Sequence, residues 1–323
     1  MSVYFGANAR KADHGGAGSS VVTTECDEES PAEVRKGRIT RVRRVLLALT
    51  LGLATVTVQA QWVNYPTPGL PRLKNGKVNL GAPAPRTKDG RPDLSGVWHV
   101  EPTALPEMKR IFGNDVDAVE VPGMTADTIS KYGISVFIDF KPGEEPIRKD
   151  VADEISRRNE HSSGLDTLSR CLPASIPLAT LLSEFTKIVQ TPGLTLVMHE
   201  LDNATRQIYT DGRPLPADPN PSWLGYSIGR WDRDALVVET IGFNGKGPLD
   251  IFGHPRSEKM RITERYRRRD VGHLDVDITF DDPVVYTRPF TIKVTHLLQP
   301  DTDILEYFCN ENEKDQIHLI NAK

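Results

Sequence analysis

The sequence predicts a mostly β protein: an antiparallel meander that forms a lipocalin-like barrel or a strongly curved sheet, preceded by a short helical or irregular part. From Thr186 onward, short segments rich in Val, Ile, Thr, Tyr and Phe follow one another at fairly even spacing. Turn dipeptides such as Pro192-Gly193 and Asp211-Gly212 separate these segments. No helical pattern intervenes, and such a meander must curl or close to protect its edge strands.

The first 60 residues are expected to lie outside this fold. Residues 1–39 are polar and without periodicity, which indicates a disordered leader or a misassigned start. Residues 40–60 resemble a signal peptide, with three arginines, an apolar run at 45–58 and a small-x-small sequence that ends at Ala60. The apolar run is shorter than the roughly 20 residues that cross a bilayer. We expect cleavage after Ala60, a periplasmic or secreted protein and no stable membrane insertion afterwards; a retained anchor helix is the alternative.

The chain as a whole is mildly acidic, and the part after residue 60 is long enough for one domain. The full sequence has 40 Lys and Arg against 44 Asp and Glu, a net charge of −4. This balance argues against a nucleic-acid partner, which usually leaves a basic footprint. Residues 61–92 contain six prolines, which forbid a regular element there. We expect this segment to run extended over a single barrel-like domain at 93–323.

The expected elements follow in chain order. DLSGVWHVEP, from Asp93, is the first strand. Residues 101–170 are less clear: 125–133 indicates a short helix with Thr125 as N-cap, and 143–164 a longer one with acids early and arginines late. The strands expected after them are TKIVQT, LTLVMHEL, TRQIYT, LGYSIGRW, ALVVETIG, MRITERYRRR, HLDVDITF, RPFTIKVTH and DILEYFC.

Several stretches together resemble an uncharacterised family of secreted bacterial proteins. They include GRPDLSGVW, NPSWLGYSIGRW and TERYRRRD, and they cover nearly the whole chain after residue 60. The resemblance implies no settled activity, so it assigns no catalytic residue. A weaker likeness to the lipocalins rests on Gly96-Val97-Trp98 at the start of the first strand.

No motif in the sequence identifies a catalytic centre. HExxH, a P-loop, CxxC and GxGxxG are all absent, so we expect no cofactor and no metal site. Two cysteines, Cys171 and Cys309, remain once the expected cleavage removes Cys26. In an oxidising compartment they are expected to form a disulfide that joins the entry of the meander to its exit.

Strand faces and loop composition indicate two acid–base candidates. In MRITERYR, Glu264 shares a face with Met260 and Ile262, which should point inward. A buried carboxylate must be paired or protonated, so Glu264 is either a general acid or base or one half of an ion pair with an arginine. His254 lies in a glycine-rich loop, and histidine suits proton transfer near neutral pH. An ordinary polar loop is the alternative there.

Small and aromatic residues in the middle of the chain indicate a binding surface. Gly225, Ser227 and Gly229 leave one strand face without large side chains, so either a ligand approaches the backbone there or the barrel turns a corner. Neighbouring aromatic residues can line a cavity, although core packing is the commoner explanation. The candidate ligand-binding residues are Tyr209, Trp223, Tyr226, Ser227, Trp231, Asn244 and Glu306.

These features support three functions. The first is an exported soluble protein that binds a hydrophobic small molecule in a barrel cavity. The second is an enzyme in the same cavity, an isomerase or hydrolase in which Glu264 and His254 act on a lipid-like or polycyclic substrate. The third is a cell-envelope interaction module. Convergence of Glu264 and His254 on one cavity would favour the enzyme, and a filled barrel would favour the interaction module.

Overall fold

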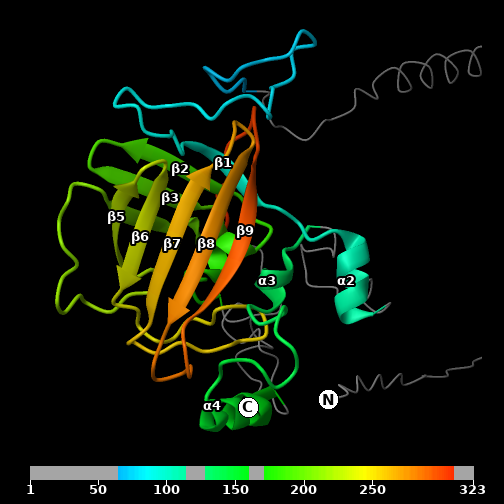
Figure 1. Ribbon diagram of the computed structural model, residues 1–323, viewed down its shortest axis with the longest axis vertical. Coiled ribbons are helices and arrows are strands. Elements are labelled where there is room, and N and C mark those ends of the chain that lie inside the picture. Colours follow the sequence, from blue (N-terminus) through cyan, green and yellow to red (C-terminus); the bar gives the residue numbers. More distant parts are fainter. Residues whose placement is uncertain (1–64, 114–127, 160–170, 309–323) are drawn as a thin grey trace, which may run out of the picture. The chain divides into compact units, whose positions relative to one another are not determined.

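The computed structural model describes residues 65–113, 128–159 and 171–308, all within one compact unit that runs from Trp62 to Lys323 (Figure 1). The fold is a closed barrel in which each strand pairs with the next and β9 pairs with β1, which confirms the predicted class. The strands are β1 (Gly96–Val100), β2 (Thr186–Thr191), β3 (Leu194–His199), β4 (Thr205–Tyr209), β5 (Tyr226–Asp232), β6 (Ala235–Ile241), β7 (Arg261–Arg268), β8 (His273–Asp281) and β9 (Phe290–Leu298).

Alternating side chains explain why these segments form a barrel. Along β8, the apolar residues from Leu274 to Phe280 are buried and the residues between them are half-buried. β9 shows the same alternation in register with β8. Each fully buried Leu, Ile or Phe side chain contributes about 1.5–3 kcal/mol, so the inward faces supply much of the fold's stability. Trp98 fills the same core, and its Nε1 donates to Leu94 O at 3.0 Å.

One pairing corrects the predicted antiparallel meander. β4 and β5 run parallel, and they pair through two residue pairs, Ile208–Ser227 and Tyr209–Ile228. A parallel pair needs a long crossover to return the chain to the starting end, whereas a hairpin needs only a tight turn. The proline-rich segment 210–225 is that crossover, so Asp211-Gly212 is not a hairpin turn.

The last expected strand is absent. DILEYFC runs from Asp303 to Cys309, and residues 303–308 form no strand, while Cys309 lies outside the described residues. The closed barrel explains this, because β9 already pairs with β8 on one edge and with β1 on the other. No edge is left for a further strand.

The helices are short and partly unexpected. Where a helix was predicted at 125–133, the structure has the shorter α3 (Lys131–Ile134), whose N-cap is Ser130. Residues 125–127 lie outside the described residues. α4 (Lys149–Asn159) lies within the longer predicted helix. The sequence did not predict α2 (Leu105–Phe112), α6 (Leu178–Leu181) or the 3₁₀ turn η2 (Leu201–Asn203). Within the described ranges no helix combines the length and apolarity that a bilayer span requires.

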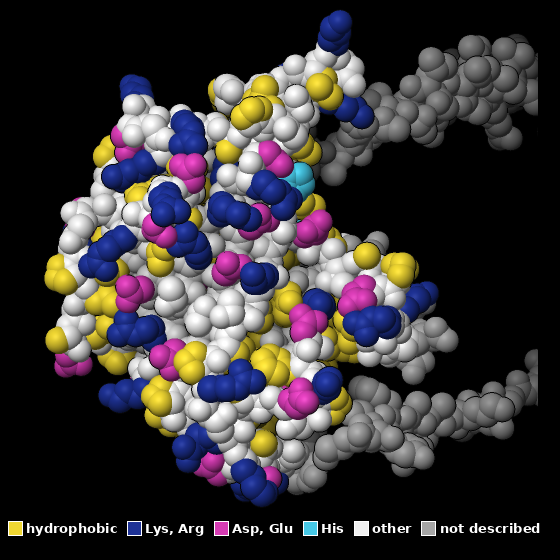
Figure 2. Space-filling model, viewed as in Figure 1, with side chains coloured by type: hydrophobic (Ala, Val, Ile, Leu, Met, Phe, Trp, Pro, Cys, Tyr) yellow, Lys and Arg dark blue, Asp and Glu magenta, His cyan; other side chains and the backbone are white. Residues whose placement is uncertain are grey.

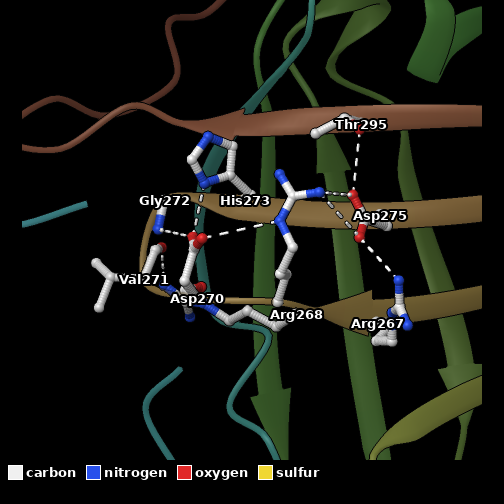
Figure 3. A network of polar contacts seen from close by, with 9 residues as sticks. Arg267, Arg268, Asp270, Val271, Gly272, His273, Asp275 and Thr295 are labelled. Atoms are coloured by element: carbon white, nitrogen blue, oxygen red, sulfur yellow. Dashed lines mark hydrogen bonds and ion pairs between the residues drawn. The ribbon is translucent and has the colours of Figure 1, made fainter. Parts of the chain in front are cut away.

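Residues 65–93 dock on the barrel end that carries the β7–β8 turn. Gly272 N donates to Leu80 O at 2.8 Å, and Val271 N donates to Ala82 O at 2.9 Å. Figure 3 shows the polar network that fixes this turn, in which Asp270 accepts from Gly272 N at 2.9 Å and contacts His273 Nδ1 at 2.7 Å. The segment contains no strand or helix, as its prolines predict.

Candidate functional site

Glu264 points into the barrel, as the strand pattern predicts. It lies in the middle of β7, and its exposed fraction is 0 %. Its carboxylate pairs with the guanidinium of Arg206 on β4, whose side chain is equally buried. The ion pair is bidentate: Arg206 Nη1 donates to Oε1 at 3.0 Å, and Nη2 donates to Oε2. Glu264 was expected to be either a general acid or base or one half of an ion pair with an arginine, and the structure shows the ion pair.

Hydroxyl groups complete the hydrogen bonding of this buried pair. Arg206 Nε donates to Ser227 Oγ at 2.9 Å, and Nη2 also donates to Thr240 Oγ1 at 2.6 Å. On the other side, Tyr266 donates its hydroxyl hydrogen to Glu264 Oε1 at 2.7 Å. Buried charges persist when they are paired and hydrogen-bonded. Here each guanidinium nitrogen of Arg206 and both carboxylate oxygens of Glu264 have a hydrogen-bonding partner.

The electrostatics of this network favour the charged pair. Burial alone would lower the pKa of Arg206, but the adjacent Glu264 carboxylate raises it above its usual value. Burial and the same carboxylate raise the pKa of Tyr266 well above its usual value. The tyrosine therefore keeps its proton and remains a hydrogen-bond donor to Glu264.

The space inside the barrel is small. A cavity of ≈ 10 Å³ lies between the strands, room for about one water molecule. Two buried histidines flank this region, and burial lowers the pKa of His199 to about 3 and that of His296 to about 4. His296 Nε2 donates to Thr180 O at 3.1 Å, and its Nδ1 has no partner among the described residues. The residues that line the cavity are Trp98, Thr180, Thr186, Ile188, Val197, Glu264, Tyr266, Leu274, Val276, Ile278 and His296.

A larger hollow lies in the barrel wall, where β4 and β5 diverge. It has a volume of ≈ 370 Å³, and we call it the β4–β5 groove. The two strands pair only from Ile208 and Ser227 onward, so the start of β4 and the chain before β5 form its opposite walls. The residues that line it are Thr205, Arg206, Gln207, Tyr209, Ser222, Trp223, Leu224, Gly225, Tyr226 and Ser227.

Stacked side chains form one end of the β4–β5 groove. The rings of Tyr209 and Tyr226 stack with centroids 5.3 Å apart and an interplanar angle of 27°. Arg213 lies on the Tyr209 ring at 3.8 Å and donates from Nη1 to the Tyr226 hydroxyl oxygen at 3.3 Å. Cation–π contact and stacking hold both rings in a fixed orientation.

A buried arginine fixes the opposite wall. Arg256 Nη2 donates to Trp223 O at 3.0 Å, and Nη1 donates to Ile176 O at 2.8 Å. Its guanidinium lies 4.3 Å from the centroid of the Phe243 ring. Burial lowers the pKa of Arg256 to about 9. Gly225 completes this wall with φ +68°, and a Cβ there would lie 2.7 Å from Ile241 O.

His254 lies apart from Glu264. Its Nδ1 contacts Asp250 Oδ2 at 2.6 Å, and this oxygen also accepts from Val136 N at 2.8 Å. The Phe137 ring packs edge-on against the imidazole at 4.7 Å. His254 is not among the residues that line the cavity beside Glu264. The two predicted acid–base residues therefore do not share that cavity.

The predicted ligand-binding residues fall into two sets. Four of them, Tyr209, Trp223, Tyr226 and Ser227, line the β4–β5 groove. Trp231, Asn244 and Glu306 do not. Glu306 was expected on the inner face of a strand, but it is exposed and outside any strand.

Trp231 and Asn244 have other contacts. Trp231 packs against the main core, with Arg91 5.8 Å from its ring centroid. Asn244 N donates to Ser222 O at 2.9 Å, and its Oδ1 accepts from Lys246 N at 3.1 Å.

The remaining predictions concern cysteines and metals. Cys309, the expected partner of Cys171, lies outside the described residues, so the disulfide stays a prediction. Among described side chains, no group of three or more His, Cys, Asp or Glu is arranged to hold a metal ion. Sequence reasoning missed Arg206, Thr240 and Arg256 as site residues. Comparison with protein-family models, curated proteins and solved structures finds no match for this chain.

Proposed function

We propose that this protein is an exported barrel protein that binds an uncharged small molecule in the β4–β5 groove. One observation carries the proposal: four residues that the sequence marks as ligand-binding line a hollow of ≈ 370 Å³. This volume falls in the range of roughly 300–1,000 Å³ that is typical of small-molecule sites. The interior cavity of ≈ 10 Å³ is far too small for the hydrophobic ligand expected there.

The lining indicates the chemistry of the ligand. Trp223, Leu224 and the two tyrosines offer apolar and aromatic surface, which suits a ligand with a flat apolar face. Thr205, Gln207 and Ser222 add hydroxyl and amide groups that can hydrogen-bond to a polar edge. Arg206 is the one charged residue of the lining, and Glu264 already neutralises it. An uncharged ligand with an apolar face and a hydroxyl or amide edge therefore fits best.

A titration with aromatic alcohols tests this proposal. 2-Naphthol and a panel of uncharged aromatic alcohols are added to ¹⁵N-labelled protein, and backbone amide shifts are followed. We expect concentration-dependent shifts at residues 205–209 and 222–227. Trp223→Ala should weaken binding at least about tenfold, because a buried aromatic contact is commonly worth more than 1.4 kcal/mol.

A matched control lies further along β5. Trp231→Ala also removes a half-buried tryptophan, but it leaves the groove lining intact, so it should leave binding unchanged. If no alcohol shifts any groove amide, or if both tryptophan variants weaken binding equally, the proposal fails.

Acid–base catalysis is the second candidate, and the Asp250–His254 pair favours it. The Asp250 carboxylate is fully buried and orients the imidazole through Nδ1, while Nε2 has no hydrogen-bonding partner among the described residues. An imidazole held in this way can accept a proton at Nε2. A screen with lipid-like and polycyclic esters tests it: turnover that His254→Gln abolishes supports an enzyme, and turnover that survives this change does not.

A further inference from the structure

Residues 71–80 and 85–94 are two copies of one pattern. PRLKNGKVNL and PRTKDGRPDL share Pro-Arg at the start, a Lys-Asn/Asp-Gly turn and a final Asn/Asp-Leu. Both copies fold into the same small hairpin: Leu73 N donates to Lys77 O at 2.8 Å, and Thr87 N donates to Arg91 O at 2.9 Å. Gly76 and Gly90 take φ values of 83° and 79° at the turns, which glycine adopts without strain.

Each hairpin is fixed to the barrel by its own arginine. Arg72 Nη1 donates to Gly76 O at 2.9 Å, and its guanidinium pairs with Asp301, just after β9. Arg86 Nη1 donates to Gly90 O at 2.7 Å and pairs in the same way with Asp234, in the β5–β6 turn. The two hairpins therefore present their tips from the same end of the barrel.

The hairpin tips carry lysines that no described acidic residue neutralises. Lys74, Lys77 and Lys88 are exposed, and within the described part of the chain none of them makes an ion pair. Residues 65–93 contain six basic and two acidic residues, a net charge of +4 in a chain whose net charge is −4. This segment therefore has a net positive charge within an acidic protein, which favours an anionic partner.

Apolar side chains lie among these cations. The exposed fractions are 71 % for Tyr65, 49 % for Leu73 and 39 % for Leu80. In Figure 2, the end of the molecule that holds this segment shows Lys and Arg side chains next to hydrophobic ones. A surface that combines lysines with exposed aromatic and aliphatic groups matches an anionic lipid interface, where the apolar groups enter the headgroup region. A nucleic acid would use the cations but leave Leu73 and Leu80 without a role.

We propose that residues 65–93, the hairpin face, dock this protein on the surface of a membrane that contains anionic lipids. β4 begins at the opposite end of the barrel from the β5–β6 turn, because β4 and β5 are parallel. Docking through the hairpin face therefore leaves Thr205 and the start of the β4–β5 groove accessible. The inference is independent of what the groove binds.

Vesicle co-sedimentation of the full chain tests the hairpin face. Vesicles of phosphatidylcholine alone are compared with vesicles that are half phosphatidylglycerol, at 0.05 and 0.5 M NaCl. We expect binding to the anionic vesicles at low salt and its loss at high salt. Neutralising each lysine should weaken binding about fivefold, so Lys74→Gln/Lys77→Gln/Lys88→Gln should weaken it on the order of 100-fold. Leu73→Ser should weaken it further at unchanged salt.

Three other exposed lysines, which form no ion pair with a described residue, provide the matched control. Lys141→Gln/Lys246→Gln/Lys259→Gln changes the net charge equally but leaves the hairpin face intact, so it should keep most of the binding. Equal losses in the two triple variants would show a general charge effect and overturn the proposal. Binding that survives both high salt and the hairpin substitutions would come from elsewhere, such as the apolar run at 45–58, and would also overturn it.

Discussion

Glu264→Gln should destabilise the fold strongly while changing the shape of the core very little. The glutamine keeps one oxygen to accept from Arg206 Nη1 or Tyr266, but its amide group faces Arg206 Nη2, which is also a donor. The guanidinium, on a residue exposed by only 1 %, then loses its counter-charge. Removing one partner of a buried ion pair costs about 3–5 kcal/mol, a large part of a typical domain's stability.

Urea unfolding of four proteins measures this effect as a double-mutant cycle. The free energy of unfolding is compared for the wild type, Glu264→Gln, Arg206→Met and the double variant. The double variant should lose less than the sum of the single losses, because it leaves no charge unpaired. Arg265→Gln serves as control: its ion pair with Asp232 lies on the surface and should be worth less than about 1 kcal/mol. A Glu264→Gln loss as small as that of the control, or strictly additive losses, would refute the reasoning.

The remaining predictions concern pH, the disulfide and export. His199 and His296 stay neutral in the fold, with pKa values lowered to about 3 and about 4, whereas the unfolded chain protonates histidine near pH 6.5. Between pH 4 and 6.5 the unfolded state thus binds more protons than the folded state. The free energy of unfolding should therefore fall as the pH drops from 6.5 towards 4. In His296→Asn this fall should be less steep. Thiol titration of unreduced, denatured mature protein should find neither Cys171 nor Cys309 free; two free thiols would exclude the bridge. Mass spectrometry of protein from its native host should find an N-terminus at Gln61, and an intact segment 1–60 would contradict export.

The period-two alternation of apolar and polar residues in the sequence predicted most of the fold. Period-two alternation in segments such as ITERYR locates both the strands and their inward faces, because one buried face imposes it. The same alternation placed Glu264 inside the barrel. It also contained the signal for its partner: in TRQIYT, Arg206 shares the face of Ile208, which is buried. An arginine on an inward face needs a buried acidic partner, and Glu264 was already predicted to face inward.

Other features depended on tertiary contacts that local patterns do not contain. DILEYFC has strand composition, but closure of the barrel by β1 and β9 leaves it no edge to join. The parallel β4–β5 pair, and with it the groove, follows from a 16-residue crossover whose Asp-Gly step resembles a hairpin turn. The aromatic residues at 209, 223 and 226 were identified from composition, but their location in the wall instead of the interior depends on that crossover.

A crystal structure of the protein with 2-naphthol, or with the tightest-binding alcohol of the panel, tests the central claim most directly. We predict ligand density in the β4–β5 groove, in contact with Trp223 and the Tyr209–Tyr226 stack, with the interior around Trp98 and His296 unchanged. Density inside the barrel between β1 and β8, with the groove empty, would contradict the account.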